Sequence, residues 1–444
     1  MNGVRKTEYF PELTGIEIGG YKSLAKKQFA ELRGLTVLAG ANSSGKSSLM
    51  QPLLLLKQTL EVSYDPGPLL LEGPNVRFSE VDQLFSRLPG GKGARTVEIA
   101  LQFQGRIEMR LEFERGATGG ITITKAEYIW DGHRIALRPG MTNQELQNQY
   151  VELLKPVYGG LPEELKEYQI FRERFFLNLA VQIKGRSGFA FPVHPLPSVF
   201  VADRMLRGLV HLPGLRGNPS RTYPATGVSK VFPGTFENYT AAVIAHWERS
   251  GERDKLEALN ADLETLGLTW KVTAKPVTDT QVELLVGRLP RPARGGARDL
   301  VNIADVGFGV SQALPVVVAL HAAEKGQVVY LEQPEIHLHP KAQVALAQVL
   351  ARAVKRGIQV VVETHSHLLL LAIQTLVAEG KQLSPNQVKL HWFVREPGDG
   401  TTTIKSADLD ENGTFGDWPE DFAKTVMELE SRFLDAAQMR LPTL

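Results

Sequence analysis

The chain has 444 residues, of which 43% are hydrophobic and 22% charged, and it contains no cysteine. This composition is typical of a folded globular protein and excludes collagen, disordered and coiled-coil rod classes, while the missing cysteines exclude disulfides, thiol nucleophiles, cysteine-ligated zinc and iron–sulfur clusters. The formal net charge is +1, so any nucleic-acid contact must come from a local patch. Length alone suggests about three domains.

The N-terminal sequence MNGVRKTEYFPEL lacks the basic and apolar regions of a secretory signal. No apolar run reaches the roughly 18–20 residues that a membrane-spanning helix needs. We therefore expect a cytoplasmic protein without a membrane partner.

The first chemical motif lies between a predicted strand, residues 35–39, and a predicted helix that begins near Ser47. The intervening sequence GANSSGKS fits G-x-x-x-x-G-K-[ST], in which the glycines allow backbone N–H groups to turn inward around phosphate oxygens. Lys46 then places a charge on the β- and γ-phosphates, the Ser47 hydroxyl ligates Mg²⁺, and the helix N-terminus adds its dipole. The motif predicts ATP binding by Gly40, Ala41, Asn42, Ser43, Ser44, Gly45, Lys46, Ser47 and Ser48.

The middle of the chain has mixed patterns. Residues 97–130 alternate apolar and polar positions, and this period of two predicts an antiparallel sheet. Residues 142–183 and 236–266 predict helices, whereas residues 282–298 begin as a strand and continue as a loop rich in Pro, Gly and Arg. There is no internal repeat.

Two further apolar runs, 327–331 and 358–362, predict buried strands, with a helix at 340–355 between them. A strand–helix–strand unit of this length implies parallel neighbours in an α/β sheet. The first run ends at Glu332, and a carboxylate at a strand tip can hold Mg²⁺ through its water shell. We predict that Glu332 and Ser47 are the metal ligands; the alternative is a carboxylate that caps the next turn.

His365 follows the second of these strands in the sequence VVVETHSH. A histidine at the tip of the neighbouring strand can reach the γ-phosphate and sense its presence. Taken alone such a histidine would be structural, but its position and order favour the sensor role.

The order of these motifs resembles the ATPase heads of the ABC and SMC type. Within them the chain is similar to bacterial P-loop ATPases of the AAA-15/AAA-21 kind, which are related to the RecF-like and overcoming-lysogenization-defect (OLD) proteins. Residues 211–223 and 408–419 resemble a subgroup with a short C-terminal domain of unknown function. The resemblance implies an α/β fold, a P-loop NTPase of ABC-ATPase head type with inserted antiparallel β and helical subdomains.

The resemblance also implies a division of the chain. We expect residues 1–90 to form the first part of the ATPase core and residues 91–280 to form the inserted β-sheet and helical subdomains. Residues 281–395 would complete the core, and residues 396–444 would form the small C-terminal domain. No sustained heptad pattern predicts a long coiled coil.

In this family the signature segment of one subunit closes over the ATP bound by another. The matching stretch is DVGFGVSQ, in which Gly307, Gly309, Ser311 and Gln312 are the expected nucleotide contacts. Because the stretch departs from L-S-G-G-Q, either Gly307 or Ser311 can stand where the signature serine usually does. A tight loop entering a core helix is the structural alternative. The resemblance implies a homodimer or a higher homo-oligomer.

A sharper departure follows Glu332. Many ABC-type ATPases have a second acid there that polarises the attacking water, but this chain has Gln333. Glutamine can orient a water but cannot take its proton, and Glu335 is then the candidate base. Slow hydrolysis, or hydrolysis that awaits a partner, follows from this hypothesis, in which Lys46, Glu332, Gln333, Glu335 and His365 are the catalytic residues.

Two groups of arginines are candidates for phosphate contacts, either with a nucleic-acid backbone or with a neighbour's ATP. They are Arg288, Arg291, Arg294 and Arg298 in the irregular loop, and Arg204, Arg207, Arg216 and Arg221 around the sequence GLRGNP. Ordinary surface charge explains them equally well.

The predicted function is an ATP- and Mg²⁺-dependent molecular switch that controls a separate effector, a nuclease or similar protein, in antiphage defence. OLD-type relatives have a nuclease domain after the ATPase, but too few residues follow His365 here. The defence setting rests on analogy alone. One alternative is a RecF-like repair ATPase that binds DNA directly, and the other is an ATP-bound scaffold with little turnover.

Overall fold

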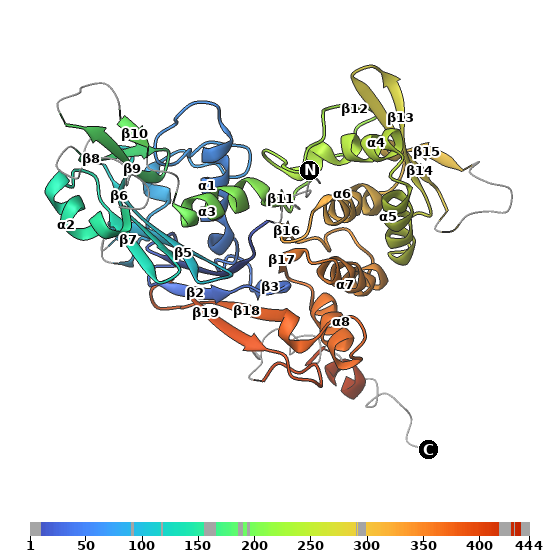
Figure 1. The fold of residues 1–444 in the computed structure, drawn as a ribbon. Coiled ribbons are helices and arrows are strands. Elements are labelled where there is room, and N and C mark those ends of the chain that lie inside the picture. The colour runs from blue at the N-terminus through green and yellow to red at the C-terminus, as the bar shows by residue number, and fades with distance from the viewer. Residues whose placement is uncertain are drawn as a thin grey trace.

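The computed structural model describes the residues 10–89, 93–116, 119–154, 166–184, 190–192, 196–289, 291, 299–416, 428–429 and 431–436. Some residues singled out from the sequence lie outside the described part of the chain: Arg294, Arg298, and residues 417–419 of the stretch 408–419 that resembles the family subgroup. Figure 1 shows the β-rich part on the left, a central sheet, and most of the helices on the right.

The central sheet has six strands in the order β11-β16-β17-β3-β18-β19, and all neighbours are parallel except the last pair. Its strands are β3 (Leu35–Gly40), β11 (Val210–Leu212), β16 (Val328–Glu332), β17 (Gln359–Thr364), β18 (Val388–Arg395) and β19 (Thr402–Asp408). The predicted parallel strand pair is confirmed as β16 and β17. β17 lies between β3 and β16. The phosphate-loop motif after β3 and the acidic motif at the end of β16 therefore lie at the same carboxyl-terminal edge of the sheet, with one strand between them.

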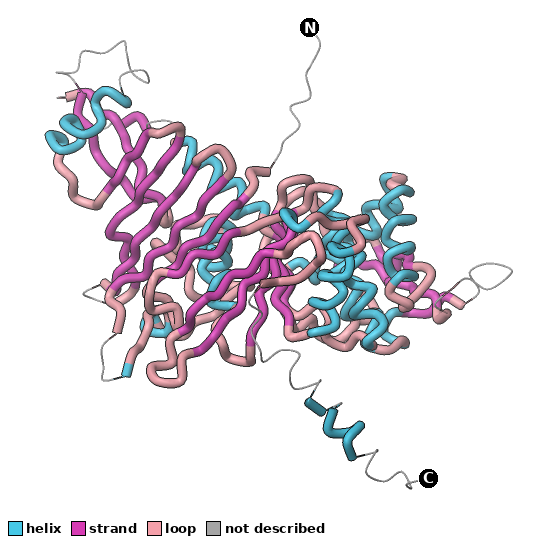
Figure 2. The backbone as a smooth tube through the Cα atoms, turned by 90° about the horizontal axis from the view of Figure 1, so that it is seen from below, coloured by secondary structure: helices cyan, strands magenta, loops and turns pink. Residues whose placement is uncertain are grey.

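The second large sheet is antiparallel, with the order β2-β1-β4-β5-β6-β7. Its strands are β1 (Leu13–Gly19), β2 (Gln28–Glu31), β4 (Thr96–Phe103), β5 (Ile107–Arg115), β6 (Ile121–Trp130) and β7 (His133–Leu137). The predicted antiparallel sheet over 97–130 is thus confirmed. Helix α1 (Ser47–Glu61) is buried nearly all round because it packs between this sheet and the central one. In Figure 2 the antiparallel strands lie on one side of the central strands and most helices on the other.

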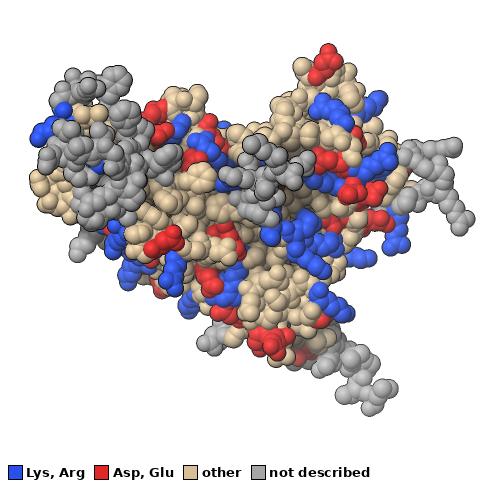
Figure 3. Space-filling model, in the orientation of Figure 1, with Lys and Arg blue, Asp and Glu red and all other residues tan. Residues whose placement is uncertain are grey.

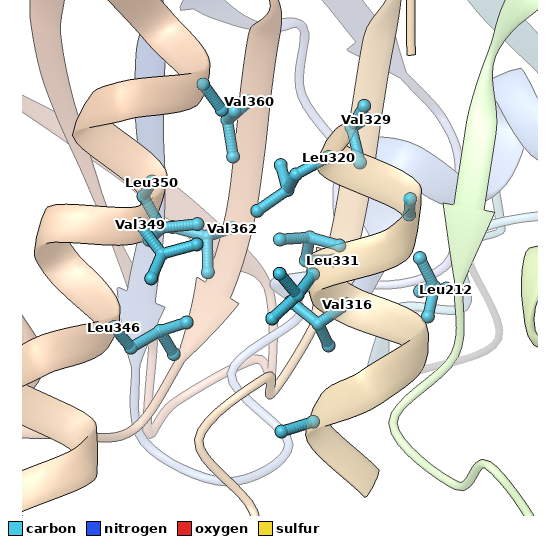
Figure 4. Close-up of a cluster of buried hydrophobic side chains, with 14 of the residues drawn as sticks. Leu212, Val316, Leu320, Val329, Leu331, Leu346, Val349, Leu350, Val360 and Val362 are labelled. Atoms are coloured by element: carbon cyan, nitrogen blue, oxygen red, sulfur yellow. The ribbon is translucent and has the colours of Figure 1, made fainter. Parts of the chain in front are cut away.

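Helices cover the opposite face of the central sheet. They are α6 (Phe308–Ala322), α7 (Pro340–Lys355) and α8 (His367–Ala378), while α4 (Thr240–Ser250) and α5 (Arg253–Thr265) pack against α6 on its outer side. Figure 4 shows Val316 and Leu320 of α6 and Leu346 of α7 pointing at Val329, Leu331, Val360 and Val362 of the strands. Apolar side chains lie on both faces of β16 and β17, so each strand buries one face on α1 and the other on α6 and α7.

The prediction of helices throughout 142–183 is wrong for its second half. Helix α2 (Asn143–Leu154) is followed by the antiparallel strands β8 (Lys166–Glu173) and β9 (Phe176–Ile183), and residues 155–165 lie outside the described part. The stretch FLNLAVQI is rich in aromatic and branched side chains, and these bury against the antiparallel sheet, which favours a strand over a helix. The predicted helices over 236–266 are confirmed as η5 (Phe236–Tyr239), α4 and α5.

The remaining elements connect these layers. The strands are β10 (Ala190–Pro192), β12 (Tyr223–Pro224), β13 (Val272–Thr278), β14 (Gln281–Gly287) and β15 (Leu300–Asn302). The helices are η1 (Val81–Gln83), α3 (Pro197–Gly208), η6 (Ile303–Asp305) and η7 (Pro385–Gln387). On the face drawn in Figure 3, basic and acidic side chains intermingle, as the net charge of +1 leads one to expect.

His391 joins the two large sheets and makes their packing sensitive to pH. Its side chain is fully buried in β18, with Nδ1 2.8 Å from Ser406 Oγ and Nε2 2.7 Å from the Glu31 carbonyl oxygen of β2. Burial lowers the pKa of His391 from 6.5 to about 4. The folded protein therefore holds this ring neutral over a range in which the unfolded chain takes up a proton.

We expect this histidine to cost about 3 kcal/mol of stability as the pH falls from 7 to 4. Its contribution is fully present above pH 6.5 and is lost as the pH falls toward the lowered value, because only the unfolded state gains the proton. Urea unfolding at several pH values, compared between the wild type and His391→Gln, measures the term. Parallel pH profiles for the two proteins would contradict the assignment.

Candidate nucleotide site

The loop between β3 and α1 is built around two glycines that no other residue can replace. Gly40 has φ 147°, and a Cβ there would lie 2.6 Å from the Phe393 carbonyl oxygen. Gly45 has φ 97°, and its Cβ would lie 2.6 Å from Ser23 Oγ and 2.7 Å from Thr402 Oγ1. The positive φ values and the lack of space for a Cβ both favour glycine. They allow the loop backbone to fold tightly at the N-terminus of α1.

Lys46 lies inside this loop. Its side chain is buried, and Nζ donates to the carbonyl oxygens of Gly40 at 3.2 Å and Ala41 at 2.9 Å. Burial lowers the pKa of Lys46, although the nearby carboxylates of Glu363 and Glu335 oppose the shift. The buried Ser44 Oγ has no hydrogen-bond partner in the structure. A loop with a buried lysine ammonium group and an unpaired hydroxyl suits the binding of a phosphate group.

Ser47 faces a carboxylate on the neighbouring strand. Its hydroxyl donates to Glu363 near the end of β17, with Oγ 2.9 Å and 3.1 Å from the two carboxylate oxygens. The Tyr330 hydroxyl donates to the same carboxylate at 3.0 Å. Burial raises the pKa of Glu363 in spite of these hydrogen bonds. Sequence reasoning assigned no role to Glu363, which stands two residues before His365.

Glu332 ends β16 directly beside Glu363 in the sheet register. One of its carboxylate oxygens lies 3.2 Å from His211 Nε2, and the other accepts from the Gly214 N–H at 3.2 Å. Burial raises the pKa of Glu332, but the contacts with His211 and Gly214 outweigh burial, and the net shift is downward. Ser47 and Glu332 thus lie at the same sheet edge, with the carboxylate of Glu363 contacting Ser47.

The remaining predicted catalytic residues gather around the same edge. Gln333 has the left-handed value φ 43°, and its N–H donates to the Glu363 carbonyl oxygen at 2.8 Å. Glu335 is buried; one oxygen accepts from the Thr364 hydroxyl at 2.6 Å and from the His365 N–H at 3.0 Å, while the other has no hydrogen-bond partner among the described residues. Burial, reinforced by the Lys46 charge, lowers the pKa of His365. A neutral imidazole can accept or donate at a phosphate.

A cavity of about 790 Å³ lies over the loop. Its walls come from β17, α1, the end of β18 and the segment after η1, and its lining residues are Lys22, Ser23, Asn42, Ser43, Gly45, Lys46, Ser47, Ser48, Gln51, Asp82, Gln83, Phe85, Arg87, Gln333, Glu363, His365 and Arg395. Arg395 is a second residue that sequence reasoning missed. It is exposed and donates to the Ser43 carbonyl oxygen at 2.9 Å, and no pattern near it signals this contact.

The predicted signature segment is not part of this cavity. Gly307 precedes the first residue of α6, Phe308 is 52% exposed, and the Ser311 hydroxyl donates back to the Phe308 carbonyl oxygen. Gln312 is buried and donates to the Gly217 carbonyl oxygen. None of the described lining residues comes from 307–312. The structure therefore separates this segment from the phosphate loop of its own chain.

Residues 211–221, which precede β12, connect the predicted signature segment with the end of β16. Arg216 is buried, and its guanidinium donates to the carbonyl oxygens of Gln312 at 3.1 Å, Glu332 at 2.8 Å and Gln333 at 3.3 Å. Arg221 pairs with Asp305 ahead of α6. Among the arginines predicted to contact phosphate, Arg216 and Arg221 thus bind groups of this chain, as Arg207 does with Asp203 and Arg204 with the Phe10 ring.

The residues fit a nucleoside triphosphate and a divalent cation. The glycines leave room at the loop where a Cβ would collide, and Lys46 supplies a positive charge for the phosphates. Hydroxyl and carboxylate oxygens such as those of Ser47 and Glu363 suit Mg²⁺. In the part of the chain that the structure describes, no group of three or more His, Asp or Glu side chains could hold a metal alone.

The parallel central sheet, the loop between β3 and α1 and the inserted antiparallel sheet define an α/β fold of the P-loop NTPase kind, as predicted. A family model described as "AAA domain, putative AbiEii toxin, Type IV TA system" matches residues 35–186 and 293–372, just over half of the chain. The chain belongs to this AAA-21 family. No protein with a curated description matches it.

Solved structures of SMC heads are similar in fold. An SMC head bound to the C-winged helix domain of ScpA has 14% identity and a TM-score of 0.47, with 90% of this chain and 99% of that chain covered. The SMC head domain from Thermotoga maritima has 11% identity and a TM-score of 0.40, covering 90% and 100%. An SMC head with an extended coiled coil, bound to the C-terminal domain of ScpA and derived from Pyrococcus furiosus, has 12% identity and a TM-score of 0.45, covering 96% and 100%.

Within the described ranges, no helix is both long enough and apolar enough to cross a bilayer.

Proposed function

We propose that the chain binds and hydrolyses ATP with Mg²⁺, that two copies pair around the bound nucleotides, and that this state controls a separate effector protein. The observation that carries the proposal is the separation of the two halves of the site. The phosphate loop, Gln333, Glu363 and His365 share one cavity, whereas Gly307 and Phe308 face outward at the start of α6. A second copy would complete the site.

In this proposal the nucleotide contacts within one copy come from the loop 40–48. Its backbone N–H groups and Lys46 hold the phosphates, Ser47 and Glu332 hold Mg²⁺, and His365 senses the γ-phosphate from the end of β17. The cation, when bound, neutralises charge that develops on the phosphate oxygens. The low pKa of His365 favours the neutral ring that such a sensor needs.

Glu335 and Gln333 divide the work of activating water. Among the described residues, one carboxylate oxygen of Glu335 is buried without a hydrogen-bond partner, while the other oxygen is fixed by Thr364 and His365. A fixed carboxylate with one unpaired oxygen suits a general base. Gln333, held by its N–H bond to the Glu363 carbonyl oxygen, lines the cavity and can orient the water. Because glutamine accepts no proton, slow turnover is part of the proposal.

The contact with the second copy would use the N-terminus of α6. The first N–H groups of a helix lack partners within it and attract anions. A Cβ added at Gly307 would have no atom within 4 Å, so the surface in front of this residue is open. Gly309 and Ser311 belong to the same first turn.

This pairing predicts opposite results for two substitutions of equal shape. Gly307→Asp places a negative charge where the partner's γ-phosphate would bind, and Gly307→Asn is its neutral counterpart; both residues are good helix N-caps. With a non-hydrolysable ATP analogue, we expect the wild type and Gly307→Asn to form dimers and Gly307→Asp to stay monomeric. Light scattering after size exclusion measures the mass. A wild type that stays monomeric with the analogue would sink the pairing proposal.

The effector is proposed to be a nuclease or similar protein in antiphage defence. The family description, which refers to a toxin–antitoxin system, supports such a setting. Control of a partner is favoured over direct, RecF-like DNA binding because Arg216 and Arg221 are already bound within the chain. Native mass spectrometry of the protein expressed with its chromosomal neighbours, with and without ATP, identifies the partner. An ATP-bound scaffold would show the same complex without turnover.

A further inference from the structure

Glu363 is a carboxylate of the cavity wall that contacts the phosphate loop through Ser47. It stands at the next-to-last position of β17, the strand between the phosphate-loop strand β3 and β16. Its side chain lines the nucleotide cavity and accepts the Ser47 hydroxyl, whereas Glu332 is not among the described lining residues. The placement follows from the strand order, because β17 ends beside the N-terminus of α1.

The neighbouring carboxylate is held by other groups. His211 and the Gly214 N–H each contact one oxygen of Glu332, so both of its oxygens already have partners from β11 and the segment after it. The oxygens of Glu363 are contacted only by hydroxyl groups among the described residues, those of Ser47 and Tyr330. A cation displaces a neutral hydroxyl donor from a carboxylate more easily than it displaces a charged or backbone donor.

The distance between Ser47 and Glu363 suits a shared cation. Mg²⁺ binds oxygen ligands octahedrally at about 2.0–2.1 Å, so two adjacent ligands lie about 2.9 Å apart. Ser47 Oγ lies 2.9 Å from one oxygen of Glu363. The hydroxyl and the carboxylate therefore have the spacing of two adjacent ligands. This arrangement differs from a metal site only by the proton shared in the hydrogen bond and by a small movement of the side chains.

We propose that Glu363 is a further metal-binding residue, which holds Mg²⁺ together with Ser47 and places a second carboxylate beside Glu332. The inference rests on the proposed function, ATP binding at the phosphate loop. Its consequence is selectivity for the metal complex of the nucleotide. Without the cation, the carboxylate of Glu363 lines the cavity opposite the phosphates, with the carboxylate of Glu332 beside it on the next strand, and their negative charge repels the phosphates.

The test compares the affinity for a fluorescent ATP analogue in Mg²⁺ and in EDTA. In the wild type we expect much tighter binding with Mg²⁺. Glu363→Gln keeps the shape and the acceptor for Ser47 but removes the charge, so the ratio of the two affinities should fall by about tenfold or more, chiefly because binding in EDTA improves. Glu324→Gln, an equal change outside the cavity, should keep the wild-type ratio.

The outcomes separate this proposal from the proposed function. Mg²⁺-dependent binding by the wild type, lost in Lys46→Met, together with a wild-type ratio in Glu363→Gln, overturns the role of Glu363 and leaves ATP binding intact. A wild type that binds the analogue under neither condition overturns both.

A luminescence measurement gives a readout that does not depend on the folding of Glu363→Gln. The Tyr330 hydroxyl lies 3.0 Å from the Glu363 carboxylate, so Tb³⁺ bound there with ADP would be excited through this phenol. We expect sensitised emission from the wild type and a clear loss in Tyr330→Phe. Emission that is unchanged in Tyr330→Phe would overturn the proposed position of the metal.

Discussion

Replacing Glu335 with Gln is expected to lower the rate of ATP hydrolysis by at least about 100-fold, the usual contribution of a general base. The substitution keeps the shape of the side chain and an acceptor for the Thr364 hydroxyl and the His365 N–H. Binding of ATP should change only slightly because the substitution keeps the shape of the side chain and its contacts with Thr364 and His365. Steady-state phosphate release and nucleotide binding, measured on the same preparation, separate the two effects.

Gln333→Glu is the companion variant. It places a carboxylate at the cavity wall, where a second acid can take the proton that glutamine cannot, and we expect faster hydrolysis than in the wild type. If neither Glu335→Gln nor Gln333→Glu changes the rate, both roles are wrong.

The second large effect is expected from Arg216. Burial lowers the pKa of its guanidinium to about 10, so the group is charged at neutral pH, and it binds three carbonyl oxygens at the end of β16 and in α6. Arg216→Gln would leave buried carbonyl groups without donors and reduce the free energy of unfolding by about 3 kcal/mol. Chemical unfolding followed by circular dichroism measures this loss.

Arg221→Gln is the matched control. Arg221 makes an exposed ion pair with Asp305, and exposed pairs contribute little to stability. Equal losses of stability in Arg216→Gln and Arg221→Gln would show that the buried carbonyl contacts are not the cause. Arg216→Lys should recover only part of the loss because lysine cannot reach three acceptors with a planar fork.

The sequence was sufficient where function depends on local order. The strand, the loop with Gly40 and Gly45, and the helix that begins at Ser47 are neighbours in the chain, so their spacing predicted their geometry. The parallel pair β16 and β17 was predictable for the same reason, since one helix connects the two strands.

Contacts between distant segments were not predictable. The role of Glu363 depends on β17 lying next to β3, a pairing between residues more than 300 positions apart. Arg216 appeared to be a surface phosphate contact because no local pattern distinguishes a buried arginine from an exposed one. The strands β8 and β9 were predicted as helix because neither shows a clear alternation: β8 mixes charged and apolar residues, and β9 is a nearly continuous apolar run.

The position of β3 in the central sheet has a consequence for synthesis. Residues 35–40 pair only with β17 and β18 among the described strands, and these strands lie near residues 360 and 390. At about 5–20 residues per second, the ribosome needs at least about 15 s to add the intervening 300 or so residues. During that time the apolar strand has no partners, and closing so long a loop is a late and slow event. The phosphate loop is thus encoded near the start of the chain but is among the last parts to take its final shape.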